Sequence, residues 1–276
     1  MKDDAIAGLL RFLRTHRSVA VLTGAGCSTA SGIPDYRDEN GGWKHQRPMQ
    51  FAEFAGSATA RRRYWARSVV GWRRIEGAMP NPAHLALARL EALGRIRAVL
   101  TQNVDDLHRR AGSRNVIDLH GVLSRVRCLG CGTIVPRADL QDRIEAMNPD
   151  WRRAPPDYMP DGDARLADAA IGEFRVPGCA GCGGVLKPDV VFFGESVPRE
   201  RVQRAMAEVL GCDALLVVGS SLMVLSGFRF ARIARAAGLP LAILNRGITR
   251  ADAIATDRFT GDCACLLPSV ADHIAF

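Results

Sequence analysis

The chain has 276 residues, of which 47% are hydrophobic, and a formal net charge of +8. This length and composition allow a substantial core and exclude an intrinsically disordered protein. The sequence has no run of about 20 apolar residues and no apolar signal segment at its start, so we expect a globular protein in the cytoplasm that does not enter a membrane.

Arginine carries nearly all of the positive charge, because only three of the 37 basic residues are lysine. The arginines are spread along the chain, whereas nucleic-acid-binding proteins more often gather their charge in a patch or tail. We therefore expect no nucleic-acid partner, although attraction to anionic ligands stays open.

Helices and strands are predicted to alternate along most of the chain. The spacing of apolar residues predicts helices over 3–15, 60–74, 82–93, just after Asp105, 198–210 and 227–237, and strands over 19–23, 97–101, 115–121, 189–195, 214–219 and 241–245. Because the strands are solid apolar blocks, this order predicts an α/β fold: a Rossmann-like parallel sheet with helices on both faces.

The pattern changes between about Cys128 and Lys187, where proline, glycine and aspartate rise and apolar periodicity fades. This change is typical of an inserted module. We expect a discontinuous Rossmann-like domain formed by residues 1–121 and 189–276, with a small inserted module at 122–188.

Two CxxC pairs lie inside the inserted stretch: Cys128 with Cys131, and Cys179 with Cys182. Four thiolates on two such turns fill the tetrahedral coordination of zinc and leave no open position, so the sequence predicts one structural zinc. A redox dithiol is the alternative, but it would leave the second matched pair unexplained.

Polar motifs follow five of the predicted strands. They are Gly24-Ala25-Gly26, Gln102-Asn103-Val104-Asp105, His120-Gly121, Gly219-Ser220-Ser221 and Asn245. Since ligands of parallel sheets bind at the carboxyl ends of the strands, these motifs are expected to meet in one crevice.

Each motif has a plainer alternative. A tight turn without a ligand would explain the two glycines, because Thr29 stands where the dinucleotide fingerprint has its third glycine. An N-cap role would explain Asp105, and a solvated ion pair would explain Asp35 and Arg37. His120 lies at a strand end beside the other motifs, and its near-neutral pKa suits a general base.

The segment "KPDVVFFGE" (187–195) is expected to show an exposed aromatic pair. It is either a core strand with a turn or an edge that accepts an extended peptide by strand addition. The candidate peptide-binding residues are Val191, Phe192, Phe193, Gly194 and Glu195.

With these motifs in order, the chain resembles a sirtuin, an NAD-dependent protein deacylase, over nearly its whole length. The carrying motifs are "GAGCSTASGIPDYRD", "TQNVDDLH", "LHG", the paired CxxC, "KPDVVFFGE", "VVGSSL" and Asn245-x-Gly247. The resemblance implies one catalytic region over 1–276, in which the Rossmann-like domain (1–121 and 189–276) binds NAD and the inserted module (122–188) binds zinc. It also implies that NAD is a consumed co-substrate and that acyl-lysine proteins are the substrates.

The resemblance also implies roles for individual residues. The acyl oxygen of a modified lysine would displace nicotinamide, and His120 would act as general base for a ribose hydroxyl that attacks the imidate, giving O-acyl-ADP-ribose, with Asn103 as a second catalytic residue. The NAD-binding residues would be Gly24, Ala25, Gly26, Ser28, Asp35, Tyr36, Arg37, Gln102, Asn103, Asp105, His120, Gly219, Ser220, Ser221, Asn245, Gly247 and Cys263.

Two departures from the commonest deacetylases concern acyl preference. The motif after 97–101 reads Asn-Val-Asp, and "SSLMVLSGFRF" lacks the usual proline. Together with "RRYWARSVVGW", this is similar to the class II branch, whose mitochondrial member is associated with ADP-ribosyl transfer and removal of lipoyl groups. Mono-ADP-ribosylation of a protein at the same NAD site is therefore the alternative activity.

Tyr64 and Arg67 form a YxxR pair like the one that selects acidic acyl chains in desuccinylase-type sirtuins. Their flanking residues match the class II helix instead, so we do not predict desuccinylation.

Overall fold

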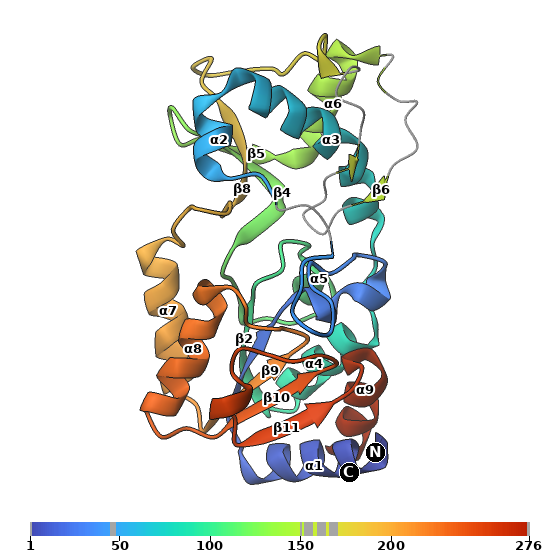
Figure 1. Cartoon of the computed structure of the whole chain (residues 1–276), viewed down its shortest axis with the longest axis vertical. Coiled ribbons are helices and arrows are strands. Elements are labelled where there is room, and N and C mark those ends of the chain that lie inside the picture. Colours follow the sequence, from blue (N-terminus) through green and yellow to red (C-terminus); the bar gives the residue numbers. More distant parts are fainter. Residues whose placement is uncertain are drawn as a thin grey trace.

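The computed structural model describes residues 2–44, 48–149, 151, 157–158, 164–165 and 171–274. Two lobes follow one another along the long axis of the molecule (Figure 1). The larger lobe holds a six-stranded sheet and both ends of the chain, and the smaller lobe holds a three-stranded sheet.

All strands of the large sheet are parallel, in the order β11-β10-β9-β1-β2-β3. Their bounds are β1 (Val19–Thr23), β2 (Ile96–Thr101), β3 (Val116–Asp118), β9 (Ala214–Val218), β10 (Leu241–Asn245) and β11 (Asp257–Thr260). The chain builds the β2 side first and the β9 side later, so the strand order reverses at β1. A crevice that can take a ligand forms at such a reversal.

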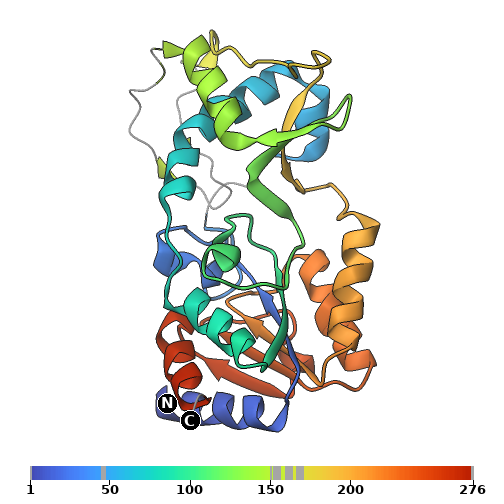
Figure 2. The same ribbon diagram turned by 180° about the vertical axis from the view of Figure 1, so that it is seen from behind.

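Helices cover both faces of this sheet (Figures 1 and 2). Val19 and Val21 of β1 pack on one face with α1, α4 and α9, whereas Ala20 and Leu22 pack on the other face with α7 and α8. These helices span Lys2–Thr15 (α1), Pro82–Ala92 (α4), Cys263–Ile274 (α9), Arg199–Leu210 (α7) and Leu225–Ala236 (α8). The expected Rossmann-like sheet, covered on both faces, is confirmed.

The smaller lobe is built from two parts of the chain. The antiparallel strands β4 (Gly121–Cys128), β5 (Ile134–Pro136) and β8 (Leu186–Val190) share a core with α2 (Phe51–Gly56), α3 (Ala58–Gly77) and α6 (Arg137–Met147). Trp65 of α3 is fully buried there beside Val126 and Leu140. The module at 122–188 therefore packs against helices that precede it by more than 40 residues.

Local sequence signals explain several element ends. Asn81 accepts a hydrogen bond from the Ala83 amide at 2.9 Å, and Pro82 occupies the first position of α4, so this helix begins where the sequence predicts. The turn η2 (Thr29–Ser31) ends at Gly32, whose φ of 81° favours glycine. Short pieces complete the chain: η1 (Ala25–Cys27), α5 (Leu107–Arg110), η5 (Asp252–Ile254) and the pair β6 (Asp157–Tyr158) and β7 (Ala164–Arg165).

The strand predicted over 189–195 has the wrong bounds. The observed strand β8 covers Leu186–Val190, after which the chain turns: Glu195 N donates to Phe192 O at 3.0 Å and Gly194 has a φ of 79°. Lys187 in β8 pairs with Glu195 at 3.1 Å and ties the turn to the strand. The strand predicted over 115–121 is likewise split between β3 and the first residue of β4.

Two elements were not predicted from the sequence: β11, which completes the sheet, and α9, which covers it. Most of the Pro- and Asp-rich stretch at 148–163 lies outside the described residues. No helix in the described ranges combines the length and the apolar character needed to cross a membrane.

Candidate functional site

The loop after β1 forms the floor of a crevice at the carboxyl end of the sheet. A Cβ on Gly26 would lie 2.9 Å from the Gly219 carbonyl oxygen, and a Cβ on Gly24 would lie 2.7 Å from Ser220 Cβ. Gly219 itself has a φ of 59°, which favours glycine. The glycines are therefore needed for the loops after β1 and β9 to touch, and this contact leaves an open cradle above them.

Asn103 joins the loop after β1 to the end of β2. Its Nδ2 donates to Gly24 O at 3.0 Å and to Ser28 Oγ at 2.9 Å, and Ser28 Oγ donates to Asp105 Oδ2 at 2.6 Å. Asp105 Oδ1 also accepts from the Leu107 amide at the start of α5. The carboxylate of Asp105 thus supports both the helix and the crevice, and burial raises its pKa.

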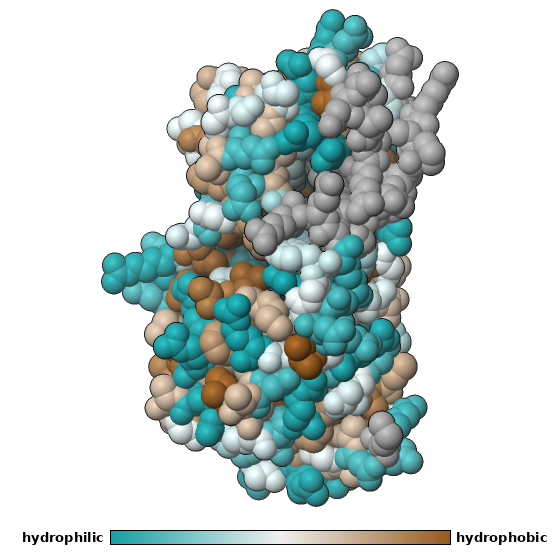
Figure 3. Space-filling view, viewed as in Figure 1, coloured by the Kyte–Doolittle hydropathy of each residue, from teal (hydrophilic) through white to brown (hydrophobic). Residues whose placement is uncertain are grey.

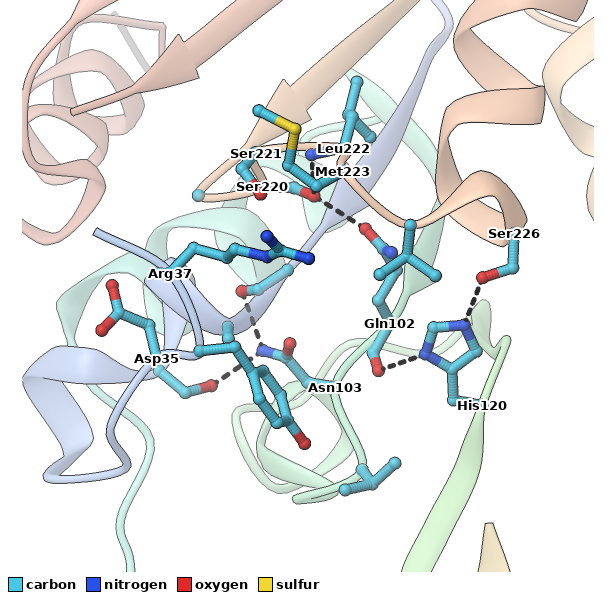
Figure 4. Close-up of a pocket in the computed structure, with 18 of the residues that line it drawn as sticks. Asp35, Arg37, Gln102, Asn103, His120, Ser220, Ser221, Leu222, Met223 and Ser226 are labelled. Atoms are coloured by element: carbon cyan, nitrogen blue, oxygen red, sulfur yellow. Dashed lines mark hydrogen bonds between the residues drawn. The ribbon is translucent and has the colours of Figure 1, made fainter. Parts of the chain in front are cut away.

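His120 lies between β3 and β4 and faces the crevice (Figure 4). Its Nδ1 is 2.9 Å from the Gln102 carbonyl oxygen, and its Nε2 is 2.8 Å from Ser226 Oγ. Burial lowers the pKa of His120, and the nearby charges of Arg201 and Arg229 lower it further. The imidazole is therefore neutral near pH 7, as a general base must be.

The ends of β9 and β10 line the opposite wall. Ser220 Oγ donates to Gln102 Oε1 at 2.7 Å, and Asn245 Nδ2 donates to Gly247 O at 2.9 Å. Cys263, the first residue of α9, places its Sγ 3.7 Å from Gly26 O. Segments more than 200 residues apart in the sequence therefore meet at one wall.

The loop that follows Gly32 covers the crevice from one side. Asp35 forms an ion pair with Lys44 at 2.7 Å. The Arg37 guanidinium lies 3.8 Å from the centre of the Trp43 ring, and one of its nitrogens donates to Gly41 O at 2.8 Å. These contacts of Asp35, Lys44 and Arg37 thus stabilise the conformation of the loop.

The segment after β8 runs alongside His120. The Val191 amide donates to His120 O at 2.7 Å, and the Phe51 amide donates to Phe193 O at 2.8 Å. The expected exposed aromatic pair is wrong for Phe192, which is buried against Phe54 and a second ring from α3, whereas Phe193 is half-buried at the crevice. The difference arises because the turn sends the Phe192 ring into the core of the smaller lobe and leaves the Phe193 ring against Tyr36 and Trp43 at the crevice.

The loops and strand ends described above line one cavity of about 820 Å³ between the lobes. Every residue assigned above to NAD or to the acyl-lysine peptide lines it, and so does Tyr64 of α3. Arg67 is not among the described lining residues, so the structure does not bring the YxxR pair together at the cavity. Hydrophobic side chains gather on the face shown in Figure 3 where the two lobes meet.

Three buried side chains that form a cluster beneath the floor of the crevice were not predicted from the sequence. Cys27, His84 and His108 have ligand-type atoms within 4.8 Å of one another, and all three are buried. His108 Nε2 is 2.9 Å from Thr23 Oγ1, and His84 Nε2 is 3.4 Å from Ser28 Oγ. Burial lowers the pKa of both histidines, that of His84 to about 4, so both support the floor as neutral rings. Their helical and loop positions gave no sequence signal that they converge.

Ser226 was also not predicted as a site residue, although it lies in the motif "SSLMVLSGFRF", which lacks the usual proline. It is the second residue of α8 and lines the cavity beside His120. A serine at the start of a helix is common, so only its contact with the imidazole distinguishes it.

The four paired cysteines converge in the small lobe. Cys128 Sγ is 3.5 Å from Cys182 Sγ, Cys131 Sγ is 3.8 Å from Cys179 Sγ, and all four sulfurs lie within 4.8 Å of one another. Sulfurs about 2.3 Å from one zinc ion stand about 3.8 Å apart at the corners of a tetrahedron. The donor set thus fits a closed, structural zinc site.

Comparison with known proteins gives consistent matches. Residues 24–226 match the profile described as the Sir2 family. The chain is 56% identical over 256 residues to an "NAD-dependent protein deacetylase" of Xanthomonas campestris, covering 93% of this chain and 87% of the relative. It is 46% identical over 273 residues to the "NAD-dependent protein lipoamidase sirtuin-4, mitochondrial" of Bos taurus, covering 98% and 87%.

Solved structures agree with these sequence matches. A structure described as "Sir2-p53 peptide-NAD+" superposes with a TM-score of 0.75 at 30% identity, covering 98% of each chain.

Proposed function

This chain belongs to the Sir2 family and is an NAD-dependent protein deacetylase, and we propose that it removes acyl groups from protein lysines with His120 as general base. The observation that carries this assignment of roles is the position of His120. Its neutral ring stands in the cavity shared by the polar strand ends, with Nδ1 bonded to a backbone carbonyl and Nε2 bonded to the Ser226 hydroxyl.

The crevice offers the groups that a dinucleotide needs. Gly24, Gly26 and Gly219 line the cavity, where their backbone would admit close approach of a pyrophosphate. A Cβ at any of these positions would push apart the loops after β1 and β9 that form this wall. When bound, NAD supplies a ribose whose bond to nicotinamide can break, so that the acyl group passes from lysine to the ribose.

Asn103 and Asp105 would orient the nicotinamide end. Both side chains are buried, and each is held by the Ser28 hydroxyl, so neither needs to reorganise when the ligand arrives. Ser220, Ser221, Asn245 and Cys263 line the wall where the adenosine half would lie.

The acyl-lysine peptide would enter beside residues 191–195. Val191 keeps this backbone against His120, and Phe193 with the rings of Tyr36 and Trp43 gives the entrance an apolar rim. The acyl chain would therefore be held by apolar contact, with the lysine backbone paired to the segment after β8.

The zinc site supports the fold and takes no part in the reaction. Cys128, Cys131, Cys179 and Cys182 would hold the ion with no position left for a substrate. The bound zinc would join the turn that ends β4 to the turn that precedes β8.

The experiment that tests this function incubates the purified protein with NAD and lysine peptides carrying acetyl, succinyl, long-chain or lipoyl groups. We expect nicotinamide release that depends on the acyl peptide, and a loss of product formation by about 10²-fold or more in His120→Ala. His273→Ala, which removes an exposed histidine on α9, is the matched control and should retain activity.

Two results would contradict the proposal. Acyl-peptide turnover without NAD would exclude the NAD-dependent reaction. Label from the adenosine part of NAD that stays on protein, with no deacylated peptide, would show the alternative activity of mono-ADP-ribosyl transfer.

A further inference from the structure

Ser226 makes one side-chain hydrogen bond, and it is to the proposed base. Its Oγ lies 2.8 Å from His120 Nε2 and bonds to no other group in the described ranges. The residue before α8 that acts as N-cap is Val224, so the Ser226 hydroxyl does not cap the helix. The hydroxyl is therefore not needed to form α8.

The direction of this hydrogen bond follows from the other nitrogen of the ring. His120 Nδ1 is 2.9 Å from the Gln102 carbonyl oxygen, and a carbonyl can only accept, so Nδ1 carries the proton. A neutral imidazole has one N–H, which leaves a lone pair on Nε2. Ser226 must then donate its O–H to Nε2.

This arrangement places the serine hydroxyl on the lone pair that the base would use. Nε2 has a single lone pair, so a substrate hydroxyl cannot donate to it while Ser226 does. The Ser226 oxygen has two lone pairs of its own, and the residue lines the same cavity as Gln102 and Ser220 (Figure 4). The oxygen can therefore accept a hydrogen bond from a group in the cavity.

We propose that Ser226 relays the proton of the ribose hydroxyl to His120. This inference rests on the proposed function, because it assigns the path by which that base acts. As the ribose O–H bond breaks, Ser226 Oγ accepts the proton and passes its own to Nε2. The freed electron pair on the ribose oxygen forms the bond to the acyl carbon, and the π pair of the imidate C=N bond moves onto the lysine nitrogen. Ser226 is unchanged at the end, and the proton rests on the imidazolium.

The surroundings of His120 raise the free energy of its protonated imidazolium form in the free protein. Arg201 of α7 and Arg229 of α8 both act on His120 with like charge, and the ring is buried. The hydroxyl of Ser226 adds to this, because a donor bonded to the lone pair stabilises the neutral ring. Removing the hydroxyl should therefore raise the pKa of His120.

Ser226→Ala removes the relay, and Ser226→Thr restores a hydroxyl. Displacement of nicotinamide by the acyl oxygen needs no base, whereas attack by the ribose hydroxyl does. The experiment measures exchange of labelled nicotinamide into NAD, which reports the first step, and kcat for deacylated peptide, which reports the whole reaction. His120→Ala is assayed alongside both.

In Ser226→Ala we expect kcat for deacylation to fall about 10-fold to 100-fold, with nicotinamide exchange kept within about twofold. The acid limb of the kcat/KM pH profile, which reports the free protein, should move to higher pH as the pKa of His120 rises. Ser226→Thr should recover most of kcat and return the limb toward its original position.

An unchanged kcat and pH profile in Ser226→Ala would overturn the relay, and so would equal losses of exchange and deacylation. A threonine variant as slow as the alanine variant would show that the hydroxyl is not the active feature and would also overturn it. If His120→Ala retained deacylation, the proposed base itself would be wrong, which separates failure of the function from failure of the relay.

Discussion

At the scale of single residues, three histidines, of which His84 and His108 are buried and His120 is half-buried, differ in what their rings touch. His120 lines the cavity and bonds there to the Ser226 hydroxyl, whereas His84 and His108 lie beneath the floor and bond to hydroxyls of the loop after β1 and of β1 itself. His84 also accepts from the Asn81 amide at 3.3 Å and closes the capping box of α4. Only the first of these rings is placed to exchange a proton with a substrate.

The neutral rings beneath the floor should make the protein sensitive to acid. The pKa of His84 is lowered by burial to about 4, so between the unfolded value near 6.5 and this value the unfolded chain binds a proton that the folded protein does not. Stability is then full above pH 6.5 and falls as pH drops toward 4. For His84 alone the loss at pH 5 is about 2 kcal/mol.

The check is urea unfolding of the protein and of His84→Gln at pH 7.5 and pH 5. Glutamine is neutral at both values, so its variant should lose less stability between them, by about 2 kcal/mol. Equal losses in the two proteins would show that His84 does not resist protonation in the folded state.

At the scale of elements, the loops after β1 and β9 touch through backbone atoms. A Cβ on Gly26 would meet Gly219 O at 2.9 Å and Gly219 Cα at 3.2 Å, and backbone atoms cannot rotate away as a side chain can. The contact between these loops therefore has little tolerance for added volume.

Gly26→Ala should separate the loops and weaken the NAD site. Overpacking of this kind costs about 1–3 kcal/mol, which corresponds to a rise of about 10-fold or more in Kd for NAD if it falls on the bound state. Isothermal titration with NAD measures the change. Gly77→Ala, at the end of α3 where a Cβ meets open space, is the control and should bind NAD as the unmodified protein does.

The two faces of the sheet show how little freedom the strands have. Odd and even residues of β1 enter two separate cores, so the apolar run "VAVLT" is buried on both sides and cannot shift register without exposing both. Such a strand ends at a defined residue, and this fixes where the loop with Gly24 begins.

At the scale of the whole molecule, the cavity needs both lobes. Gly24 and His120 come from the larger lobe or its border, whereas Tyr64 and Phe192 pack in the core of the smaller one. The cysteine cluster joins that small core, because Cys128 belongs to the core and Cys179 packs against it. Loss of zinc should therefore act on the small lobe first.

Cys131→Ala removes one of the four sulfurs. We expect bound zinc to fall from one per chain to none, and hydrogen exchange to speed up in α3, α6, β4 and β8 while β1 and β9 stay protected. Metal analysis and exchange mass spectrometry measure these. Cys265→Ala, an exposed cysteine outside the cluster, should leave both unchanged; a zinc-free Cys131→Ala with full protection in α3 would contradict the structural role.

Much of the fold is readable from the sequence because it depends on local patterns. The blocks at 19–23 and 241–245 match β1 and β10, and the cap residues around α4 mark its start. The turn after β8 was not predicted, because "VVFF" has the apolar character of a strand and nothing in it shows that one ring enters the small core while the other faces the cavity. The last helix, α9, contains Pro268 and was missed although it covers the sheet.

The sequence by itself determined the order of the strand-end motifs, the pairing of four cysteines and the likeness of the whole chain to one family. Only the tertiary structure decided that Ser226 bonds to His120, that His84 and His108 share a buried group with Cys27, and that α3 packs with the zinc module. The physical reason is the distance along the sequence between the residues that interact. Strand blocks, caps and cysteine turns are set within a few residues, whereas a hydrogen bond between side chains 106 residues apart exists only after α8 has packed beside the end of the sheet.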